Sequence, residues 1–519
     1  MNMKGGFKVN EIVRRPIKDR VDVLLIYPIW VTAFGRGKLQ RMLPPLGILS
    51  IASYLKAHGF EVQILDMHAE GTSVEKFREI LKALKPRFVG ITVLSSHFRA
   101  AHRIASLSRE EVPDARVIVG GTHAELYPEV MLKNPAIEGV CRGDGEEVML
   151  QFVQDRPLES ILGLSFRKNQ REVQNNAAQT VEMNLDKYPL PAYELIDFYN
   201  YFPAVGTYKT LPGLNALATR GCPGKCTFCN SAKTILRGRS VESMVELMQM
   251  LRDDYGIKQV TFYDDTFTAN PRFVRSFCDE LIAKKVDINW VCYVRGDMFS
   301  EEMASLMARA GCHHVLVGIE SGSESLMKDI GKHIEKERYI EMVERAHRHG
   351  MEVRGAFIVG HINETHASLE ETLQFAMEMD VDFFQPSVLT PYPGTALYQM
   401  ARAENLLLHE DYERYGQGEV ILKMKNLETK DIERYMFVSF LRFYFRPISI
   451  WRQIKRLNNK AQLMDIFKSF YIIFLERFKK GKENNIQDWH SFDLEKTLSL
   501  PVFVPDEHKL TYEVKQKEA

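Results

Sequence analysis

The sequence predicts an α/β protein with three parts: an N-terminal doubly wound parallel sheet, a partial (β/α)6 barrel of the TIM type and a helical C-terminal region. Two series of short apolar runs alternate with helical patterns, which indicates parallel strands with helices on both faces. In the second series the runs recur about every 30 residues, the length of one strand–helix unit of such a barrel. After residue 420 the alternation stops, and helical patterns rich in aromatic and basic residues follow.

The first series follows a polar tail, residues 1–20, and fills a predicted domain over residues 21–185. Its strands are short runs of the buried type, at 21–28, 61–66, 87–94, 115–123 and 139–147. A helix is predicted over 45–59, because a Pro-Pro pair precedes it and a glycine ends it. Ligands of such sheets bind at the carboxyl ends of strands, so we expect one near the turn at Gly120 and Gly121. A tight turn without a ligand would leave the same pattern.

The second series follows residues 186–212, which are rich in proline and tyrosine and are predicted to be a linker wrapped on the surface. The barrel domain is then predicted over 213–420 and the helical C-terminal region over 421–519. The predicted barrel strands are 214–220, 258–265, 287–295, 313–321, 352–360 and 381–390. Because these make six units rather than the eight of a complete TIM barrel, we expect a partial barrel.

The composition is that of an ordinary globular protein with balanced charge. Lys and Arg together number 68, as do Asp and Glu, so the formal net charge is zero and gives no support to a nucleic-acid partner. The N-terminus lacks an apolar signal core, and no apolar run reaches the roughly 18 residues of a membrane span. We therefore expect a cytoplasmic protein, in which the thiols stay reduced.

Three of the seven cysteines are crowded into the stretch TRGCPGKCTFCNSAK, in a loop after the first barrel strand. Clustered cysteines in a reducing compartment indicate a metal or catalysis rather than a disulfide. The C-x3-C-x2-C spacing of Cys222, Cys226 and Cys229 can supply three corners of a cubane [4Fe–4S] cluster and leaves one iron for an exchangeable ligand. The alternative is structural zinc, which would need a fourth ligand, and the next cysteine, Cys278, has no partner at short spacing.

The cysteine spacing, with Phe228 just before the third cysteine, resembles the signature of the radical S-adenosylmethionine superfamily. In that family the open iron binds S-adenosylmethionine, and one electron from the cluster splits the sulfonium to give a 5′-deoxyadenosyl radical. The radical abstracts hydrogen from an unactivated carbon, so the cofactors carry the difficult chemistry. The resemblance thus implies a radical enzyme with a [4Fe–4S] cluster, S-adenosylmethionine and a reductant such as flavodoxin or ferredoxin. No residue stands out as a catalytic acid or base.

Further barrel segments resemble the same superfamily. VGIESGS resembles its fourth-strand segment and implies that Glu320 and Ser321 lie at S-adenosylmethionine. GAFIVGHINET resembles its fifth-strand element, with Ile358 at the adenine, although Ile362 replaces the usual proline. The loops YDDTFT and LTPYPGT match those after the second and sixth strands. Two alternatives stay open: Glu320 as a helix N-cap or ion-pair partner, and the aspartates of YDDTFT as caps of the next helix.

The N-terminal domain resembles the Rossmann-like cobalamin-binding domain that is fused to many radical S-adenosylmethionine enzymes. The resemblance lies in residues 44–66, 119–129 and 141–147. It implies cobalamin beside Ser95, Gly120, Gly121 and Thr122. DMHAEG also matches the pattern that supplies an axial histidine in other cobalamin proteins, but there it follows the first strand and here the second, so we do not expect His68 to bind cobalt. A domain of this kind without cobalamin is the alternative.

The C-terminal region is rich in basic and aromatic residues. Residues 435–482 hold eleven Lys or Arg against two acidic residues, with aromatic residues between them. Basic amphipathic helices can lie on an anionic membrane, which predicts peripheral contact with the inner membrane surface. The alternative is a helical lid that packs on the barrel and roofs its catalytic mouth.

Together these patterns predict an enzyme that methylates or oxidatively cyclises an unactivated carbon of a hydrophobic substrate, a lipid or a tetrapyrrole, with cobalamin as a further cofactor. A broad resemblance to anaerobic magnesium-protoporphyrin monomethyl ester cyclases and hopanoid-modifying enzymes suggests such substrates. No residue separates methylation from cyclisation. Two alternatives stay open: a radical enzyme with a cobalamin-free N-terminal domain that forms carbon–carbon bonds on a lipid, and a non-catalytic metal-binding module.

Overall fold

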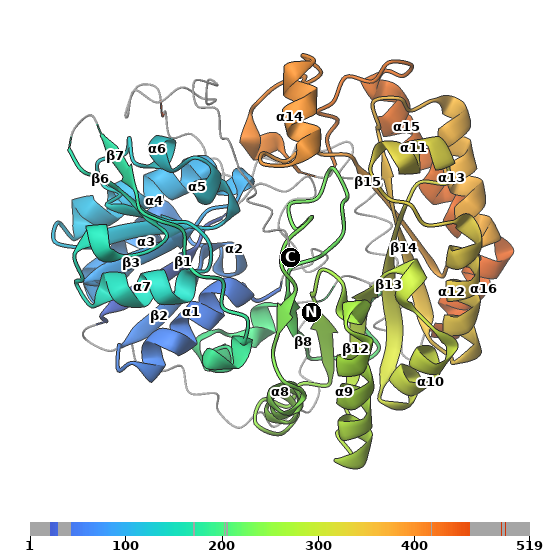
Figure 1. Ribbon diagram of the computed structural model, residues 1–519, viewed down its shortest axis with the longest axis horizontal. Coiled ribbons are helices and arrows are strands. Elements are labelled where there is room, and N and C mark those ends of the chain that lie inside the picture. Colours follow the sequence, from blue (N-terminus) through green and yellow to red (C-terminus); the bar gives the residue numbers. More distant parts are fainter. Residues whose placement is uncertain are drawn as a thin grey trace, which may run out of the picture.

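The computed structural model describes residues 21–29, 43–169, 172–201, 203, 206–416 and 418–456, together with Trp489 and Leu494. Two parallel sheets, each with its own helices, lie side by side (Figure 1). We call the part built on the first sheet the N-terminal unit and the part built on the second sheet the barrel unit.

The N-terminal unit contains a seven-stranded sheet in the order β2-β1-β3-β4-β5-β6-β7. Its strands are β1 (Val23–Tyr27), β2 (Val62–Asp66), β3 (Phe88–Thr92), β4 (Arg116–Gly120), β5 (Gly139–Cys141), β6 (Leu164–Arg167) and β7 (Val173–Asn175). The first five are parallel, which confirms the predicted doubly wound sheet. The last two are antiparallel and were not predicted. Both strands are short. Antiparallel neighbours are joined without a helix, so the strand–helix alternation that marks parallel strands in the sequence is missing here.

Helices cover both faces of this sheet. They are α1 (Leu46–Ala57), α2 (Met67–Glu70), α3 (Val74–Leu84), α4 (Phe98–Glu111), α5 (Thr122–Leu126), α6 (Pro128–Met131) and α7 (Gly145–Val153). Val23 and Leu25 of β1 pack with α1 and α7, whereas Leu24 and Ile26 pack with α3 and α4. Successive side chains of a strand point to opposite faces, so a strand that is apolar throughout is buried on both sides.

The barrel unit contains six parallel strands in the order β15-β14-β13-β12-β11-β8. They are β8 (Gly213–Ala216), β11 (Gln259–Phe262), β12 (Asn289–Val294), β13 (Cys312–Glu320), β14 (Glu352–Val359) and β15 (Phe383–Val388). Because β8 and β15 form opposite edges of the sheet, the barrel is open, as predicted. Its helices are α8 (Val241–Asp253), α9 (Pro271–Ala283), α10 (Glu301–Arg309), α11 (Glu324–Asp329), α12 (Lys336–Arg348), α13 (His366–Glu378) and α14 (Ala396–Ala403). Two short antiparallel strands, β9 (Thr219–Arg220) and β10 (Arg237–Gly238), flank the cysteine loop.

The segment between the two units is partly buried, so it is not only wrapped on the surface as the sequence predicts. Tyr188, Tyr193 and Tyr201 are all buried. The Tyr193 hydroxyl donates to the carbonyl oxygen of Asn215 in β8 (2.6 Å), and the Tyr201 hydroxyl donates to Asp66 Oδ2 at the end of β2 (2.9 Å). A tyrosine can bury its ring and still satisfy its hydroxyl, so the segment joins the two units rather than crossing solvent.

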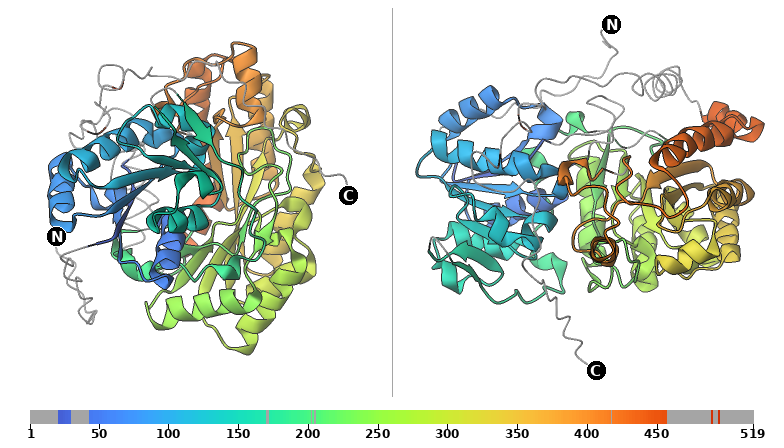
Figure 2. Two further views of the ribbon diagram at one scale, coloured as in Figure 1. Left: turned by 60° about the vertical axis from the view of Figure 1, so that its left-hand side comes forward. Right: turned by 90° about the horizontal axis from the view of Figure 1, so that it is seen from above.

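The helices α15 (Thr429–Tyr444) and α16 (Pro447–Arg456) pack against the β15 edge of the barrel (Figure 2). Phe443 stacks on Phe384 of β15 with ring centroids 5.3 Å apart, and Arg452 pairs with Asp380, which lies just before that strand. Since the cysteine loop follows the carboxyl end of β8, α16 lies at the opposite end of the strands. The helix α16 therefore does not roof the catalytic mouth, whereas the start of α15 packs beside the carboxyl ends of β14 and β15. The remaining predicted basic residues, 457–482, lie outside the described residues. In the described part of the chain, no helix has the length and apolar character needed to cross a membrane.

Candidate functional site

The three cysteines of the loop differ from the other four in exposure. Cys222, Cys226 and Cys229 are partly exposed, whereas the remaining cysteines are buried. The backbone N–H of Gly224 donates to Cys222 Sγ (3.4 Å), and Thr266 Oγ1 lies 3.7 Å from the same sulfur. The loop therefore presents its thiols at the carboxyl end of the barrel strands, where barrels of this type carry chemistry.

Local backbone contacts fix both ends of the loop. The Cys222 N–H donates to Thr234 Oγ1 (2.9 Å), and the Thr234 N–H donates to the Cys222 carbonyl oxygen (3.0 Å). Gly221 has φ of 96°, and a Cβ there would clash with the carbonyl oxygen of Ile235. Only glycine fits this position without strain, so the entry of the chain into the loop is set by Gly221.

Asp264 anchors the strand that leads into the loop. Its carboxylate accepts hydrogen bonds from the N–H of Thr219 (2.5 Å), the hydroxyl of Thr219 (2.6 Å) and the N–H of Ala218 (3.2 Å). The following helix, α9, is capped instead by Asn270, which accepts the N–H of Phe273. The interpretation of the aspartates as helix caps is therefore wrong for Asp264, which binds a neighbouring strand end.

The chemistry of the donor set suits a cluster. Cys222, Cys226 and Cys229 offer three partly exposed thiols on one loop. A cubane cluster binds each thiolate at a separate iron. Three such thiols therefore suit three irons of a [4Fe–4S] cluster.

Glu320 occupies a strained position at the carboxyl end of β13. Its φ is 72°, and the pairing of β13 with β14 shifts register between Gly318 and Glu320. The buried Lys332 donates from Nζ to Glu320 Oε1 (2.6 Å) and to the Gly318 carbonyl oxygen (2.6 Å). Burial alone would lower the pKa of Lys332, but the charge of Glu320 holds that pKa above its usual value. Glu320 is thus an ion-pair partner, and α11 begins after Ser323 rather than after Glu320.

The segment that carries Lys332 also contacts the cysteine loop. The Thr227 N–H donates to the carbonyl oxygen of Ile330 (2.9 Å), and a Cβ at Gly331 would lie 2.9 Å from the carbonyl oxygen of Lys225. One short stretch of backbone therefore supports both the thiols and Glu320. The sequence did not single out Lys332, because a lone lysine between two helices has no distinguishing pattern.

The other residues predicted at S-adenosylmethionine lie around the same end of the barrel. Phe228 and Ile358 are half-buried against one apolar cluster that includes Leu389. Ser321 follows Glu320 directly, and its hydroxyl accepts the N–H of Ser323 (3.1 Å). The structure thus brings Phe228 together with Ile358 and places Ser321 beside Glu320.

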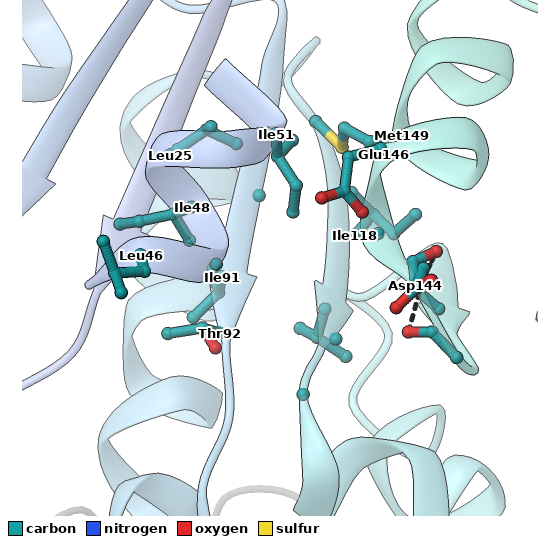
Figure 3. Close-up of a pocket in the computed structure, with 18 of the residues that line it drawn as sticks. Leu25, Leu46, Ile48, Ile51, Ile91, Thr92, Ile118, Asp144, Glu146 and Met149 are labelled. Atoms are coloured by element: carbon teal, nitrogen blue, oxygen red, sulfur yellow. Dashed lines mark hydrogen bonds between the residues drawn. The ribbon is translucent and has the colours of Figure 1, made fainter. Parts of the chain in front are cut away.

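A cavity of about 280 Å³ lies at the carboxyl ends of β3, β4 and β5, between α1 and α7 (Figure 3). Gly120 and Gly121, beside which the sequence predicts a ligand, belong to its wall. Ser95 and Thr122 are not part of this wall: Ser95 Oγ lies 3.2 Å from His123 Nδ1, and Thr122 is exposed at the start of α5. The wall also includes Asp144 and Glu146, from the matched stretch 141–147, and three residues that the sequence did not suggest, namely Thr92, Leu217 and Arg220.

The cavity wall fits part of a large amphiphilic group such as cobalamin. Ile91 and Ile118 contribute an apolar floor, while glycines expose backbone at the strand ends. At Gly121, φ is 98° and a Cβ would lie 2.9 Å from the carbonyl oxygen of Val93, so only glycine keeps this backbone in place. His68 is not in the wall, and Asp66 caps α2 by accepting the N–H of His68 (3.1 Å). A helix cap therefore accounts for the aspartate of the DMHAEG pattern.

Comparisons with known proteins agree with this architecture. Residues 217–376 match the family model of the Radical SAM superfamily, and residues 34–153 match that of the B12 binding domain. An uncharacterized methyltransferase of Pyrococcus horikoshii is 34% identical over 433 residues, which are 82% of this chain and 93% of the relative. An anaerobic magnesium-protoporphyrin IX monomethyl ester cyclase of Rubrivivax gelatinosus is 26% identical over 88% of this chain and 83% of its own length.

The fold is also similar to a solved structure. The cobalamin-dependent S-adenosylmethionine radical enzyme OxsB, with aqua-cobalamin and S-adenosylmethionine bound, aligns with a TM-score of 0.68 at 18% identity, over 88% of this chain and 72% of that one. The radical SAM domain implies a [4Fe–4S] cluster, S-adenosylmethionine and a reductant, and the B12 binding domain implies cobalamin. The chain belongs to the radical S-adenosylmethionine enzymes that carry an N-terminal cobalamin-binding domain.

Proposed function

We propose that this enzyme transfers a methyl group to an unactivated carbon of a hydrophobic substrate, a lipid or a tetrapyrrole. The observation that carries the proposal is a shared wall: Leu217 and Arg220, which lead into Cys222, also line the cavity of the N-terminal unit. A reaction that uses two cofactors on one substrate needs their sites to be adjacent. The 34% identical relative is named as a methyltransferase, which supports the same reaction.

We assign the cofactor sites to the residues that the sequence suggested. Cys222, Cys226 and Cys229 would hold the cluster, and their partial exposure leaves a route for an electron from flavodoxin or ferredoxin. Around S-adenosylmethionine we place Phe228, Glu320, Ser321 and Ile358. The cobalamin site would include Gly120 and Gly121, with Ser95 and Thr122 nearby. When bound, the cluster supplies the electron that cleaves S-adenosylmethionine, and cobalamin supplies a carrier for the methyl group.

Oxidative cyclisation is the second candidate. The similarity to the magnesium-protoporphyrin cyclase of Rubrivivax gelatinosus favours it, since that alignment covers 88% of this chain. The two reactions leave different products of S-adenosylmethionine. Methyl transfer leaves S-adenosylhomocysteine, whereas reductive cleavage alone leaves 5′-deoxyadenosine.

The experiment uses the full chain, purified anaerobically with its cluster and hydroxocobalamin. It is incubated with reductant, S-adenosylmethionine labelled as trideuteromethyl, and lipid or tetrapyrrole extracts as separate substrates. A trideuteromethylated product formed with S-adenosylhomocysteine supports methyl transfer. A product without the label, formed with 5′-deoxyadenosine only, supports cyclisation and overturns the first proposal. The matched control is the variant with all three loop cysteines replaced by alanine, which should form neither product.

We propose membrane contact as a separate property of α16. Phe445, Trp451 and Ile454, at or near this helix, are among the most exposed large apolar side chains of the described residues. Arg442 and Arg452 pair with Glu370 and Asp380 of the barrel, so these two basic residues are already used in packing. The exposed apolar side chains Phe445, Trp451 and Ile454 therefore support membrane contact, and these two arginines do not.

Sedimentation with anionic vesicles at low and high salt tests this contact. Replacing Trp451 and Ile454 together by serine should release the chain from the vesicles. The matched control is Met183→Ser, which removes a similarly exposed apolar side chain that lies just before the segment between the two units. If the wild-type chain stays in the supernatant at low salt, the membrane proposal is wrong.

A further inference from the structure

A partly buried ion-pair network joins the cavity of the N-terminal unit to the cysteine loop. Arg220 donates from Nη2 to Glu146 Oε1 (2.6 Å) and to Ser50 Oγ (3.3 Å), and from Nη1 to Asp144 Oδ1 (3.2 Å). Ser50 in turn donates to Glu146 Oε1 (2.6 Å). Glu146 is only 2% exposed. One guanidinium from the barrel unit thus holds side chains from both helices that flank the cavity, α1 and α7.

The two carboxylates lie at the start of α7. Asp144 precedes the helix and Glu146 is in its first turn, where negative charge is favoured by the helix dipole. Figure 3 shows both side chains in the cavity wall. Arg237 also pairs with Asp144, and it is the cross-strand neighbour of Arg220 in the β9–β10 pair. The two strands that flank the cysteine loop therefore each bring an arginine to Asp144, and Arg220 also lines the cavity.

The backbone position of Arg220 directly determines the position of Cys222, the first cysteine of the loop. Only Gly221 separates Arg220 from Cys222, and the clash that a Cβ would make there fixes the path of the chain. The backbone hydrogen bonds between Cys222 and Thr234 close the loop immediately afterwards. A movement of the Arg220 backbone therefore cannot be absorbed by a flexible stretch before the thiols.

We propose that Arg220 is a positioning residue that couples the cobalamin cavity to the cluster loop, so that occupancy of either site alters affinity at the other. This inference rests on the proposed assignment of cobalamin and the cluster to these two sites. A group that fills the cavity must contact the wall that Arg220 and Glu146 form, and S-adenosylmethionine would bind beside the loop that Arg220 leads into. The planar fork of arginine suits this role because it fixes direction as well as charge. Thermodynamic linkage makes the effect reciprocal.

The test measures the dissociation constant of hydroxocobalamin with and without S-adenosylmethionine, on cluster-loaded protein under non-reducing conditions. Their ratio is the coupling factor, which for wild type should be about fivefold or more. Arg220→Met should bring the factor close to one while iron and sulfide content stay at wild-type levels. Glu146→Gln should do the same, and the double variant should be no worse than either single variant, because each change removes the same pair. The matched control is Arg239→Met, which removes an interface arginine that donates to Tyr188 and Pro189 but does not line the cavity.

The outcomes distinguish a failure of this inference from a failure of the proposed function. A wild-type coupling factor of one, or an unchanged factor in both Arg220→Met and Glu146→Gln, overturns the inference while leaving the proposed function intact. If wild-type protein does not bind hydroxocobalamin at all, the proposed function fails and the inference fails with it. If Arg220→Met does not fold, Glu146→Gln decides alone, since it keeps the size of the side chain and removes only the charge.

Discussion

The cysteine loop and the cavity of the N-terminal unit lie at the carboxyl ends of two parallel sheets, yet they are built in different ways. The loop offers side-chain sulfurs, three within eight residues, and a short run of backbone hydrogen bonds holds it. The cavity offers backbone exposed by glycine, with side chains gathered from four strands, two helices and the neighbouring unit. A site made of side-chain ligands can be recognised from spacing. A site made of backbone and shape can be recognised only after the chain has folded.

The largest expected effect is the loss of one cofactor site while the other is kept. Replacing Cys222, Cys226 and Cys229 together by alanine should remove the cluster and abolish 5′-deoxyadenosine formation, because no thiolates remain for the irons. Hydroxocobalamin binding should survive, since the cavity takes none of its wall from these residues. Iron and sulfide analysis, chromatography of the nucleoside products and corrinoid absorbance provide the measurements. Continued formation of 5′-deoxyadenosine would show that the cluster lies elsewhere.

The next effect concerns the buried ion pair beside the loop. Lys332→Met should destabilise the protein by about 3–5 kcal/mol, because Glu320 is left as an unpaired buried charge. The same variant should bind S-adenosylmethionine more weakly, which equilibrium dialysis would measure. The control is the double variant Lys332→Met/Glu320→Gln, which should regain most of the stability in urea unfolding. Equal stability of the single and double variants would contradict a role for the pair.

A smaller effect is expected at the glycines of the cavity. Gly121→Ala should cost about 1–3 kcal/mol, because φ of 98° places an alanine in a disfavoured region. Hydroxocobalamin affinity should fall with it. Gly47→Ala is the matched control: it also lines the cavity, but no atom lies within 4 Å of the added Cβ and its φ is not positive, so the unfolding free energy should not fall. A similar loss of stability in both variants would show that backbone conformation is not the cause.

The smallest effect is a pH dependence of stability at the end of β14. Burial raises the pKa of Glu364 to about 7 from 4.5, although Glu364 accepts hydrogen bonds from Ser368 and from the N–H groups of His361 and Gly360. The folded state therefore holds this proton more tightly than the unfolded state. Stability from this group is present below about pH 4.5 and is lost as the pH rises through 7.

Glu364→Gln keeps the shape of the side chain and removes its titration. Unfolding by urea between pH 5 and 7.5 should show a flatter dependence in the variant than in the wild type. Asp66 and Asp264, whose pKa values burial raises to about 6, should supply part of the slope that remains. An identical slope in both proteins would mean that Glu364 stays ionised throughout this range.

The sequence by itself determined the elements and the metal-binding chemistry. Each predicted parallel strand of both sheets is present, because an apolar run of this length bounded by turn residues has few other ways to be buried. The cysteine loop was equally clear in the sequence, since three candidate ligands lie close together in the chain. Gly120 and Gly121 stood out because a strand end followed by two glycines is itself a local signal, and both line the cavity.

Only the tertiary structure decided which distant residues meet. Arg220 and Glu146 are 74 positions apart, and nothing near either residue in the sequence marks the other. The same holds for Lys332 with Glu320, for the burial of Tyr193 between the units, and for the docking of α16 at the amino end of the strands. Ion pairs and burial depend on the three-dimensional approach of groups, whereas strand formation and ligand spacing are local properties of the chain.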